Sequence, residues 1–292
     1  MATATSHWIT EGRVTAPSLE MAQPCPVSDI HVMTIILNIT KVIFLGSEAT
    51  DIIFNRKIDV AILVDVREPD PTTIAHLKRQ LKRRYSLFSV LHTHINRGKG
   101  PGKVGGVLSI TTERIFHPEV VSQCQEGSSL TIKATFGGCP VVFHGLYLPS
   151  ANRDEGSFSS RVSAMSGESP EIVVAADISA AADFAMDQGA LLVVGGDFNS
   201  SPRQRAQAHR ICLNDICLDN GLVHASTAKE LLLPTYVKRQ SATHIDYQIR
   251  NGTHVLATSC FPFEVAQFPY DHQPLMGIYR LPRSGPSVRH QD

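Results

Sequence analysis

The strongest constraint on the fold of this chain is a series of nine short apolar runs, separated by longer polar or amphipathic stretches. Runs of five to nine residues have the length of β-strands. A helix that crosses a bilayer needs about 20 apolar residues. Most of the runs are apolar at nearly every position, as in sheets that are covered on both faces. They predict strands at 31–37, 60–64, 85–91, 104–110, 129–136, 140–148, 190–196, 243–249 and 274–281.

Three longer stretches between these runs have the pattern of helices. They cover residues 72–84, 172–188 and 203–220. The last two end directly before Gly189 and Gly221, and glycine commonly follows the last residue of a helix. Apolar strands interspersed with helices indicate a layered α/β or α+β fold, in which helices cover sheets.

One large domain is the simplest organisation of the chain. Residues 1–29 are rich in Thr, Ser, Ala and Pro without periodicity, and residues 283–292 are also polar and aperiodic. Between them the sequence shows no long linker, internal repeat or heptad pattern. We therefore expect a disordered leader over 1–29, a single domain over 30–282 and a disordered tail over 283–292.

Composition places few limits on function. Of 292 residues, 42% are hydrophobic and 18% are charged, as in ordinary globular proteins. The 27 basic residues balance 27 acidic ones, so a nucleic acid would have to be held by a local basic patch. Six scattered cysteines indicate buried free thiols, and the N-terminus lacks the regions of a signal peptide. We expect an intracellular protein, nuclear or cytoplasmic, that is not secreted and binds no membrane.

The stretch LLVVGGDFNSSP, residues 191–202, brings polar groups out at the end of a buried strand. Asp197 and Asn199 are two residues apart, so in an extended segment their side chains point to the same side. This places a carboxylate beside an amide at a strand end, where α/β folds often bind ligands. Gly, Asp and Asn are also common in turns, so the stretch taken alone is equally consistent with a simple turn.

Other predicted strands end in the same way. Asn38 ends the first strand, Asp65 follows the second, Tyr147 ends the strand at 140–148, Asp246 lies in THIDYQI, and His272 precedes the last strand. Each residue has an ordinary structural explanation, such as a turn, an N-cap or core packing. Those explanations do not account for the repeated placement of polar groups at strand ends.

In their order along the chain, these motifs resemble those of the endonuclease/exonuclease/phosphatase superfamily, from about Ile30 to Arg280. PTYVKRQSATHIDYQI is similar to a segment of the endonuclease domains of non-LTR retrotransposons. The resemblance implies a DNase-I-like fold, an α/β sandwich of four layers with two mixed β-sheets face to face and helices outside. The matching residues are Asn38, Gly105 with Gly106, Tyr147 with Pro149, Gly196 to Asn199, Ser241 to Tyr247, and Asp271 with His272.

Catalytic roles follow from this resemblance. Asp197 would orient or deprotonate an attacking water, and Asn199 would fix that water and the phosphate. His272 would contact the scissile phosphate while Asp246 holds its tautomer. Tyr147 would donate a hydrogen bond to a phosphate oxygen.

The resemblance also implies a divalent cation, Mg²⁺ or Mn²⁺, bound by Asn38, Asp65 and Asp271. Both ions prefer oxygen ligands. Asp65 is a departure, because the superfamily usually has Glu at this position and Asp is one methylene group shorter. Glu68 in DVRE is an alternative ligand, although the following proline indicates a turn; we favour Asp65.

Smaller departures occur at Gly145, where the superfamily often has Asn, and at Tyr270, in place of a serine. Both leave the principal catalytic groups intact.

Surface charge is the available guide to the substrate. Arg97, Lys99 and Lys103 lie in the glycine-rich segment NRGKGPGK and are candidates for binding a nucleic-acid backbone, most simply DNA. The basic stretch 78–84 is more simply a solvated helix face. The sequence thus favours a metal-dependent DNA endonuclease of retroelement type. Alternatives are a catalytically decayed copy that binds nucleic acid or protein, and a phosphatase of inositol or lipid phosphates.

Overall fold

The computed structural model describes ten stretches of the chain: 30–39, 47–66, 71–93, 105–149, 157–200, 213–227, 229–238, 241–252, 257–262 and 271–281. The predicted leader and tail lie outside these stretches. All nine predicted strands correspond to strands of the structure, with shifted ends in several cases. None of the helices within the stretches has the length and apolar character needed to cross a bilayer.

The first sheet, called sheet A, has six strands in the order β13-β14-β1-β2-β4-β3. Only β1 and β2 are parallel to each other, and the other neighbours are antiparallel, so the sheet is mixed. The strands are β1 (Ile30–Asn38), β2 (Val60–Val64), β3 (Phe88–His92), β4 (Val107–Thr112), β13 (Ala257–Pro262) and β14 (Leu275–Leu281).

Sheet B also has six strands, in the order β5-β6-β7-β8-β12-β9, with β7 and β8 parallel. Its strands are β5 (Ile115–Gln123), β6 (Ser129–Phe136), β7 (Cys139–Tyr147), β8 (Leu191–Asp197), β9 (Leu222–His224) and β12 (Asp246–Asn251). A separate two-stranded sheet consists of β10 (Tyr236–Lys238) and β11 (Ser241–Thr243). A short 3₁₀ helix, η2, covers Glu230–Leu232.

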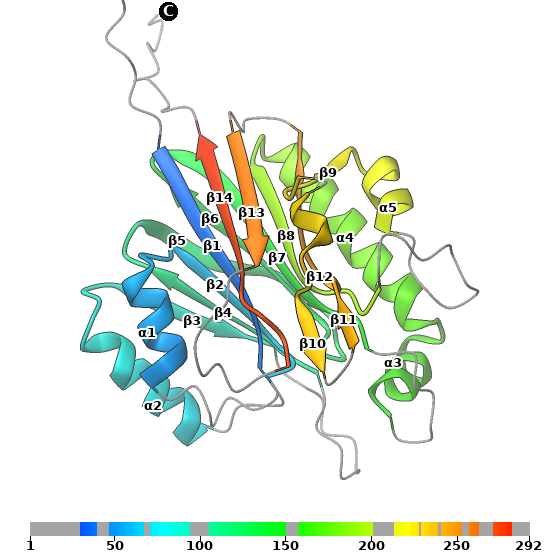
Figure 1. The fold of residues 1–292 in the computed structure, drawn as a ribbon, viewed down its shortest axis with the longest axis horizontal. Helices are drawn as coiled ribbons and strands as arrows, with labels where there is room; N and C mark the ends of the chain where they lie inside the picture. Colours follow the sequence, from blue (N-terminus) through cyan, green and yellow to red (C-terminus); the bar gives the residue numbers. More distant parts are fainter. Residues whose placement is uncertain are drawn as a thin grey trace, which may run out of the picture.

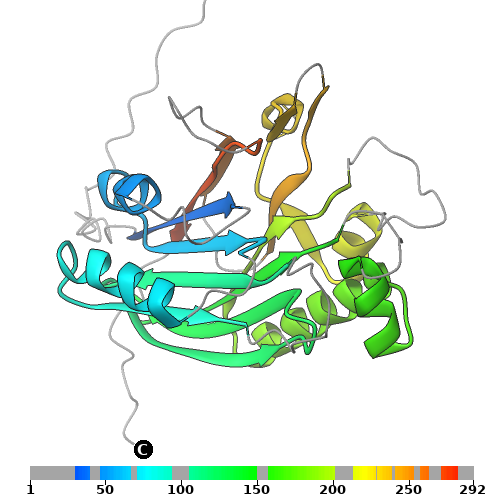
Figure 2. The same ribbon diagram turned by 90° about the horizontal axis from the view of Figure 1, so that it is seen from below.

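The two large sheets pack face to face, and helices cover their outer faces (Figures 1 and 2). Side chains from both sheets share one central hydrophobic core, which includes Ile36, Ile62, Phe143 and Val193. A second core lies between sheet A and two helices, and a third between sheet B and two others. This confirms the predicted four-layered sandwich. The helices are α1 (Ser47–Asn55) and α2 (Pro71–Lys82) on sheet A, α4 (Pro170–Asp187) and α5 (Leu213–Asp219) on sheet B, and α3 (Phe158–Ser166).

Glycine allows the sheets to approach closely. A Cβ atom on Gly145 would lie 2.7 Å from both Ile62 and Val107 of the opposite sheet. One on Gly195 would lie 2.4 Å from Ile36. These separations are too short for carbon atoms in van der Waals contact. An asparagine at position 145, which the superfamily often has, would therefore require Ile62 and Val107 to move.

The longest helix, α4, has a clear signal at each end. The Ser169 side chain caps its first turn by accepting a hydrogen bond from the Ile172 amide at 3.4 Å, and Pro170 occupies the first helical position. Beyond its C-terminus, Gly189 adopts a left-handed conformation with a φ of 57°. These signals confirm the helix predicted at 172–188 and extend its start by two residues.

Several elements were not predicted from the sequence. They are mostly short, or lie at sheet edges where few positions are buried, so their apolar pattern is weak. Strand β5, for example, is an edge strand with a proline and mostly exposed residues. The predicted helix at 203–220 is described only as α5, over 213–219. The elements missed were α1, α3, η2, β5, β9, β10, β11 and β13.

The four cysteines in the described stretches are free thiols, as predicted.

Candidate functional site

The candidate site lies where strand ends from both sheets meet. In sheet B, Asp197 is the register partner of Tyr147 on the parallel strand β7 and of Asp246 on the antiparallel strand β12. In sheet A, Asn38 at the end of β1 pairs with Val64 at the end of β2. The topology thus brings residues that are up to 234 positions apart to one end of the sandwich.

A hydrogen bond joins the two sheets at this end. Asn38 Nδ2 donates to Asp197 Oδ2 at 2.8 Å, and both side chains are buried. Asn38 Nδ2 also lies 3.3 Å from His272 Nε2. The predicted metal ligand of sheet A is therefore in direct contact with two of the predicted catalytic residues.

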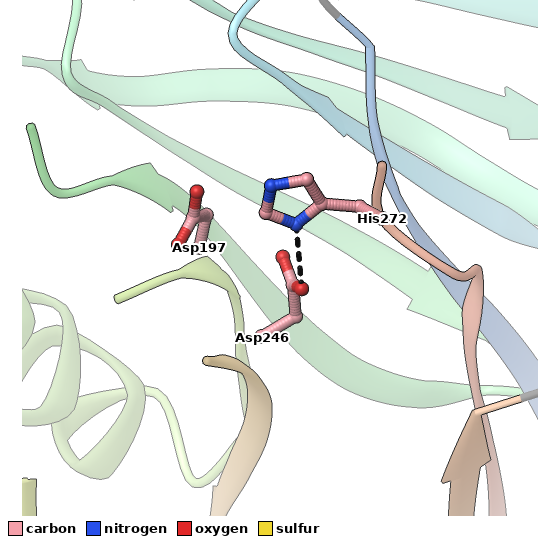
Figure 3. Close-up of side chains that lie close together, drawn as sticks. All are labelled: Asp197, Asp246 and His272. Atoms are coloured by element: carbon pink, nitrogen blue, oxygen red, sulfur yellow. Dashed lines mark hydrogen bonds and ion pairs between the residues drawn. The ribbon is translucent and has the colours of Figure 1, made fainter. Parts of the chain in front are cut away.

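His272 and Asp246 form a buried pair. Asp246 Oδ2 lies 2.8 Å from His272 Nδ1, and the side chains are 2% and 13% exposed. Figure 3 shows the imidazole edge between the carboxylates of Asp246 and Asp197. Nδ1 donates to Asp246, so Nε2 can accept from Asn38 only while the ring is neutral, because an imidazolium carries a proton on both nitrogens. This contact fixes the tautomer and directs Nε2 toward Asp197.

The charges of this group influence one another strongly. Burial raises the pKa of Asp197 well above its usual value, and the Asp246 carboxylate raises it further, while His272 opposes the rise. Burial alone would lower the pKa of His272, but the carboxylates of Asp246, Asp197 and Asp271 more than offset this and bring it to about 9. At neutral pH the carboxylates therefore favour an imidazolium at His272.

Asn199 holds Asp197 in place. Its backbone amide donates to Asp197 Oδ1 at 2.8 Å, and its Nδ2 lies 3.2 Å from Asp197 Oδ2. Nδ2 also donates to the Leu148 carbonyl at 2.7 Å. Asn199 has a φ of 43°, a left-handed conformation that Asn tolerates better than most residues. The structure thus places Asn199 beside Asp197, as predicted, with its amide nitrogen engaged in the turn.

Asp65 lies near the group but is held by the backbone. Its Oδ1 accepts a hydrogen bond from the Gly105 amide at 3.0 Å, and its φ is 55°. Its charge contributes to the raised pKa of Asp197. Gly105 has a φ of 93° and packs against Phe158, where a Cβ would come within 2.5 Å of the ring. The glycine pair of the motif therefore provides both a turn and a binding partner for Asp65.

Tyr147 is buried beside the site. Its ring centroid lies 5.9 Å from that of Phe158, and its backbone amide donates to the Ser128 carbonyl at 2.8 Å. The ring belongs to the core between the sheets. Its strand position next to Asp197 agrees with the predicted placement.

Asp271 lies outside the buried group. Its side chain is 49% exposed and makes an ion pair with Lys238 at 3.0 Å. The structure thus connects this predicted metal ligand to the β10–β11 hairpin. Four further candidates lie outside the described residues: Glu68, Arg97, Lys99 and Lys103.

The basic helix α2 is oriented away from the site. Its C-terminal end leads to Phe88, which pairs with Thr112 at the end of sheet A remote from Asn38. Its cationic residues near Lys82 are thus distant from the strand ends, which agrees with a solvated helix face.

Thr235 is a buried residue of the site that the sequence analysis did not single out. Its hydroxyl accepts hydrogen bonds from the Ile245 and Asp246 amides, each at 3.0 Å. A signal was present, because Thr235 belongs to the P-T-Y of the segment that resembles retroelement endonucleases.

The donor atoms fit a divalent cation. Ligand atoms of Asp197, Asp246 and His272 all lie within 4.8 Å of one another. Asp246 Oδ1 is buried and has no hydrogen-bond partner among the described residues, although buried polar atoms are usually paired. A cation would supply that missing partner and would also favour ionised carboxylates. Carboxylate oxygens are ligands that Mg²⁺ and Mn²⁺ prefer.

Comparison with known proteins gives a result for structure only. No protein-family model matches the sequence, and a search of curated proteins found no match. The 3′ phosphatase NExo from Neisseria, solved bound to a product DNA hairpin, is 14% identical, with a TM-score of 0.58 over 84% of this chain and 98% of that chain.

The endonuclease domain of TRAS1, a telomere-specific non-LTR retrotransposon, is 11% identical, with a TM-score of 0.54 over 86% of this chain and 99% of that domain. An endonuclease/exonuclease/phosphatase family protein from Leptotrichia buccalis is 12% identical, with a TM-score of 0.54 over 85% and 99%. Identities this low establish a shared fold. The predicted resemblance is confirmed at that level, and the chain has the DNase-I-like sandwich.

Proposed function

We propose that this chain is a divalent-metal-dependent phosphodiester hydrolase, and specifically a DNA endonuclease of the retroelement type. One observation carries the proposal: Asn38, Asp197, Asp246 and His272 come from separate elements and meet in one buried hydrogen-bonded group. A stable fold does not require acids and a histidine to be gathered in this way, and burying them is costly.

Each residue has a task in phosphodiester hydrolysis. Asp197 orients the attacking water and accepts its proton, while Asn199 fixes the Asp197 carboxylate through its backbone amide. His272, as an imidazolium held by Asp246, offers Nε2–H to an oxygen of the scissile phosphate. Tyr147 contributes a phenolic donor from the neighbouring strand. Together these groups bind the developing negative charge and hold the nucleophile.

A bound Mg²⁺ or Mn²⁺ would neutralise charge on the phosphate and on the leaving oxygen. Asn38, Asp65 and the free Oδ1 of Asp246 are the atoms and residues best placed to hold it. Asp271 could contribute only after leaving its ion pair with Lys238.

DNA is favoured as substrate by two observations. The P-T-Y and I-D-Y arrangement of residues 234–247 resembles retroelement endonucleases. Solved structures with the same fold include the TRAS1 endonuclease domain and a phosphatase bound to a DNA hairpin. The cationic segment with Arg97, Lys99 and Lys103 would bind the backbone, so binding should weaken as salt rises.

A decayed, binding-only copy is the second candidate. It is favoured by Asp65, which is shorter than the expected glutamate and is already bound to the Gly105 amide. In that case the protein would still bind nucleic acid but would not cleave it.

Nicking of supercoiled plasmid tests the proposal. We expect nicking with Mg²⁺ or Mn²⁺, none with EDTA, and none with His272→Ala. Asp187→Asn is the matched control, because Asp187 is an exposed acid at the end of α4, and it should nick normally. DNA binding without nicking in either metal would support the decayed copy. Release of phosphate from inositol phosphates, without nicking, would identify a phosphatase.

A further inference from the structure

The short hairpin of β10 and β11 connects the two halves of the site. It belongs to neither large sheet, and Figure 1 places it beyond the lower end of β12. Asp246 starts β12 of sheet B, whereas His272 precedes β14 of sheet A. Asp246 and His272 therefore come from different sheets. Their 2.8 Å contact depends on the spacing between the start of β12 and the segment before β14.

On the sheet B side, one buried hydroxyl fixes the backbone of Asp246. Thr235 Oγ1 accepts from the Ile245 and Asp246 amides, each at 3.0 Å, and Thr235 is 0% exposed. These two hydrogen bonds use both acceptor positions of the hydroxyl oxygen. The backbone amide of Thr235 donates to the Thr243 carbonyl at 3.0 Å, which ties it into the hairpin.

On the sheet A side, the same segment holds the backbone around His272. The Gln273 amide donates to the Thr235 carbonyl at 2.6 Å, and the Val237 amide donates to the Asp271 carbonyl at 2.8 Å. Tyr236 pairs with His272 as an isolated bridge, and its ring packs edge-on against the imidazole at 4.9 Å between centroids. Thr235 therefore bonds to both segments, with its hydroxyl beside Asp246 and its carbonyl beside His272, while Tyr236 and Val237 add contacts on the His272 side.

We propose that Thr235 is a positioning residue for the Asp246–His272 pair. The Thr235 hydroxyl sets the position of Asp246, and the Thr235 carbonyl sets the position of His272. The side chain and the backbone of Thr235 thus fix the distance between Asp246 and His272. Its role in catalysis rests on the proposed function, since the pair is assigned to phosphate binding. The geometric part of the inference stands independently of the substrate.

A matched pair of variants separates the hydroxyl from the bulk of the side chain. Thr235→Val keeps the shape and removes the acceptor, whereas Thr235→Ser keeps the acceptor and removes a methyl group. Misplacement of a catalytic group by about 1 Å can cost about 100-fold. We therefore expect Thr235→Val to lower the kcat for plasmid nicking by about 10- to 100-fold with KM changed less than about twofold, and Thr235→Ser to stay within about threefold of wild type.

A second measurement does not depend on catalysis. In metal-free protein labelled with ¹⁵N-histidine, the His272 Nδ1–H proton should give a downfield resonance because of its bond to Asp246, assigned by its loss in His272→Gln. The resonance should persist in Thr235→Ser and shift upfield or broaden in Thr235→Val. If Thr235→Val does not fold by circular dichroism, Thr235→Ala replaces it, since a small side chain lets water reach the two amides.

The outcomes are distinct. A folded Thr235→Val or Thr235→Ala protein with wild-type kcat and an unchanged His272 resonance overturns the proposal. Equal losses in Thr235→Ser and Thr235→Val also overturn it, because packing of the methyl group would then be responsible. If the wild-type protein cleaves nothing, the proposed function fails, and the resonance alone decides whether Thr235 positions the pair.

Discussion

Sheet B delivers its polar side chains to the site on three neighbouring strands, whereas sheet A delivers Asn38 from β1 and Asp65 just after β2. On the sheet B side, Asp197 is held by Asn199, and Asp246 is held through Thr235. On the sheet A side, Asp65 accepts a hydrogen bond from the Gly105 amide, and it departs from the expected glutamate. The two halves thus differ in their match to the expected residues: sheet B carries the expected acids, whereas sheet A carries an acid that is one methylene group shorter.

This difference suggests a division of labour. Groups that handle the water and the phosphate must be accurately placed before substrate binds, because preorganised charge is most effective in catalysis. Mg²⁺ usually keeps several of its waters in a protein site, so a few protein ligands decide how tightly it is bound. The sheet B half should therefore mainly govern the rate of reaction, whereas metal affinity should depend on the sheet A residues together with Oδ1 of Asp246.

The largest expected effect is at Asp197, on the sheet B side. Asp197→Asn keeps the size of the side chain but cannot accept the proton of the water, so kcat should fall by about 10³- to 10⁴-fold. The measurement is single-turnover nicking at saturating Mn²⁺. Activity within tenfold of wild type would break the comparison, since the rate would then depend on other groups. Asp187→Asn again serves as the control.

Asp246→Asn should have the next largest effect. The amide cannot stabilise the imidazolium and can leave His272 in the wrong tautomer, so we expect a loss of about 10²-fold in kcat. The apparent Kd for Mn²⁺ should also rise, because Oδ1 of Asp246 is one of the atoms placed to hold the cation. Mn²⁺ titration by electron paramagnetic resonance checks the second part. A large loss of Mn²⁺ affinity with an intact rate would show that Asp246 serves mainly as a metal ligand.

Asp65→Glu should sharpen the comparison from the sheet A side. The longer side chain would extend its oxygens toward Asn38, so Mn²⁺ should bind about tenfold more tightly while the rate at saturating metal changes little. Isothermal titration calorimetry measures the affinity, with Glu68→Gln as a companion variant. Loss of affinity in Glu68→Gln but not in Asp65→Asn would transfer the ligand role to Glu68.

The smallest effect on the reaction is expected at Asp59, the buried acid just before β2, at the opposite end of that strand from Asp65. Burial raises its pKa from 3.8 to about 6, although it accepts the Met33 amide and lies 3.3 Å from Arg114. Between these pKa values the folded state binds more protons than the unfolded chain. The free energy of unfolding therefore falls as pH rises through this window, by at most about 1.4 kcal/mol per pH unit.

Asp59→Asn should remove that part of the pH dependence and leave nicking unchanged. Urea unfolding at pH 4.5, 5.5 and 6.5 measures the free energy of unfolding of both proteins. The difference between the two proteins cancels the titration of all other groups. An identical slope in the two proteins would contradict the expected protonation of Asp59. A loss of nicking would show that the two ends of β2 are coupled.

The sequence predicted the parts of the site that depend on strand ends. One clear apolar strand ends in GDFN, and another strand starts in IDY. The register of the sheet then places Asp197 beside Asp246. The contact of Asp65 with Gly105 could not be predicted, because it depends on left-handed backbone conformations at both residues. For Thr235 the only signal was its place in the P-T-Y motif, since a buried threonine in a short, weakly patterned segment gives no periodic signal.

The close approach of Gly145 and Gly195 to the opposite sheet has a consequence beyond packing. The thickness of the sandwich is set by the absence of side chains at these positions, and the hydrogen bond between Asn38 and Asp197 spans that same thickness. A methyl group added in the middle of the molecule would act as a spacer and lengthen the span. The geometry of the candidate site should thus change in response to substitutions deep in the interior of the protein, at residues that lie outside the site.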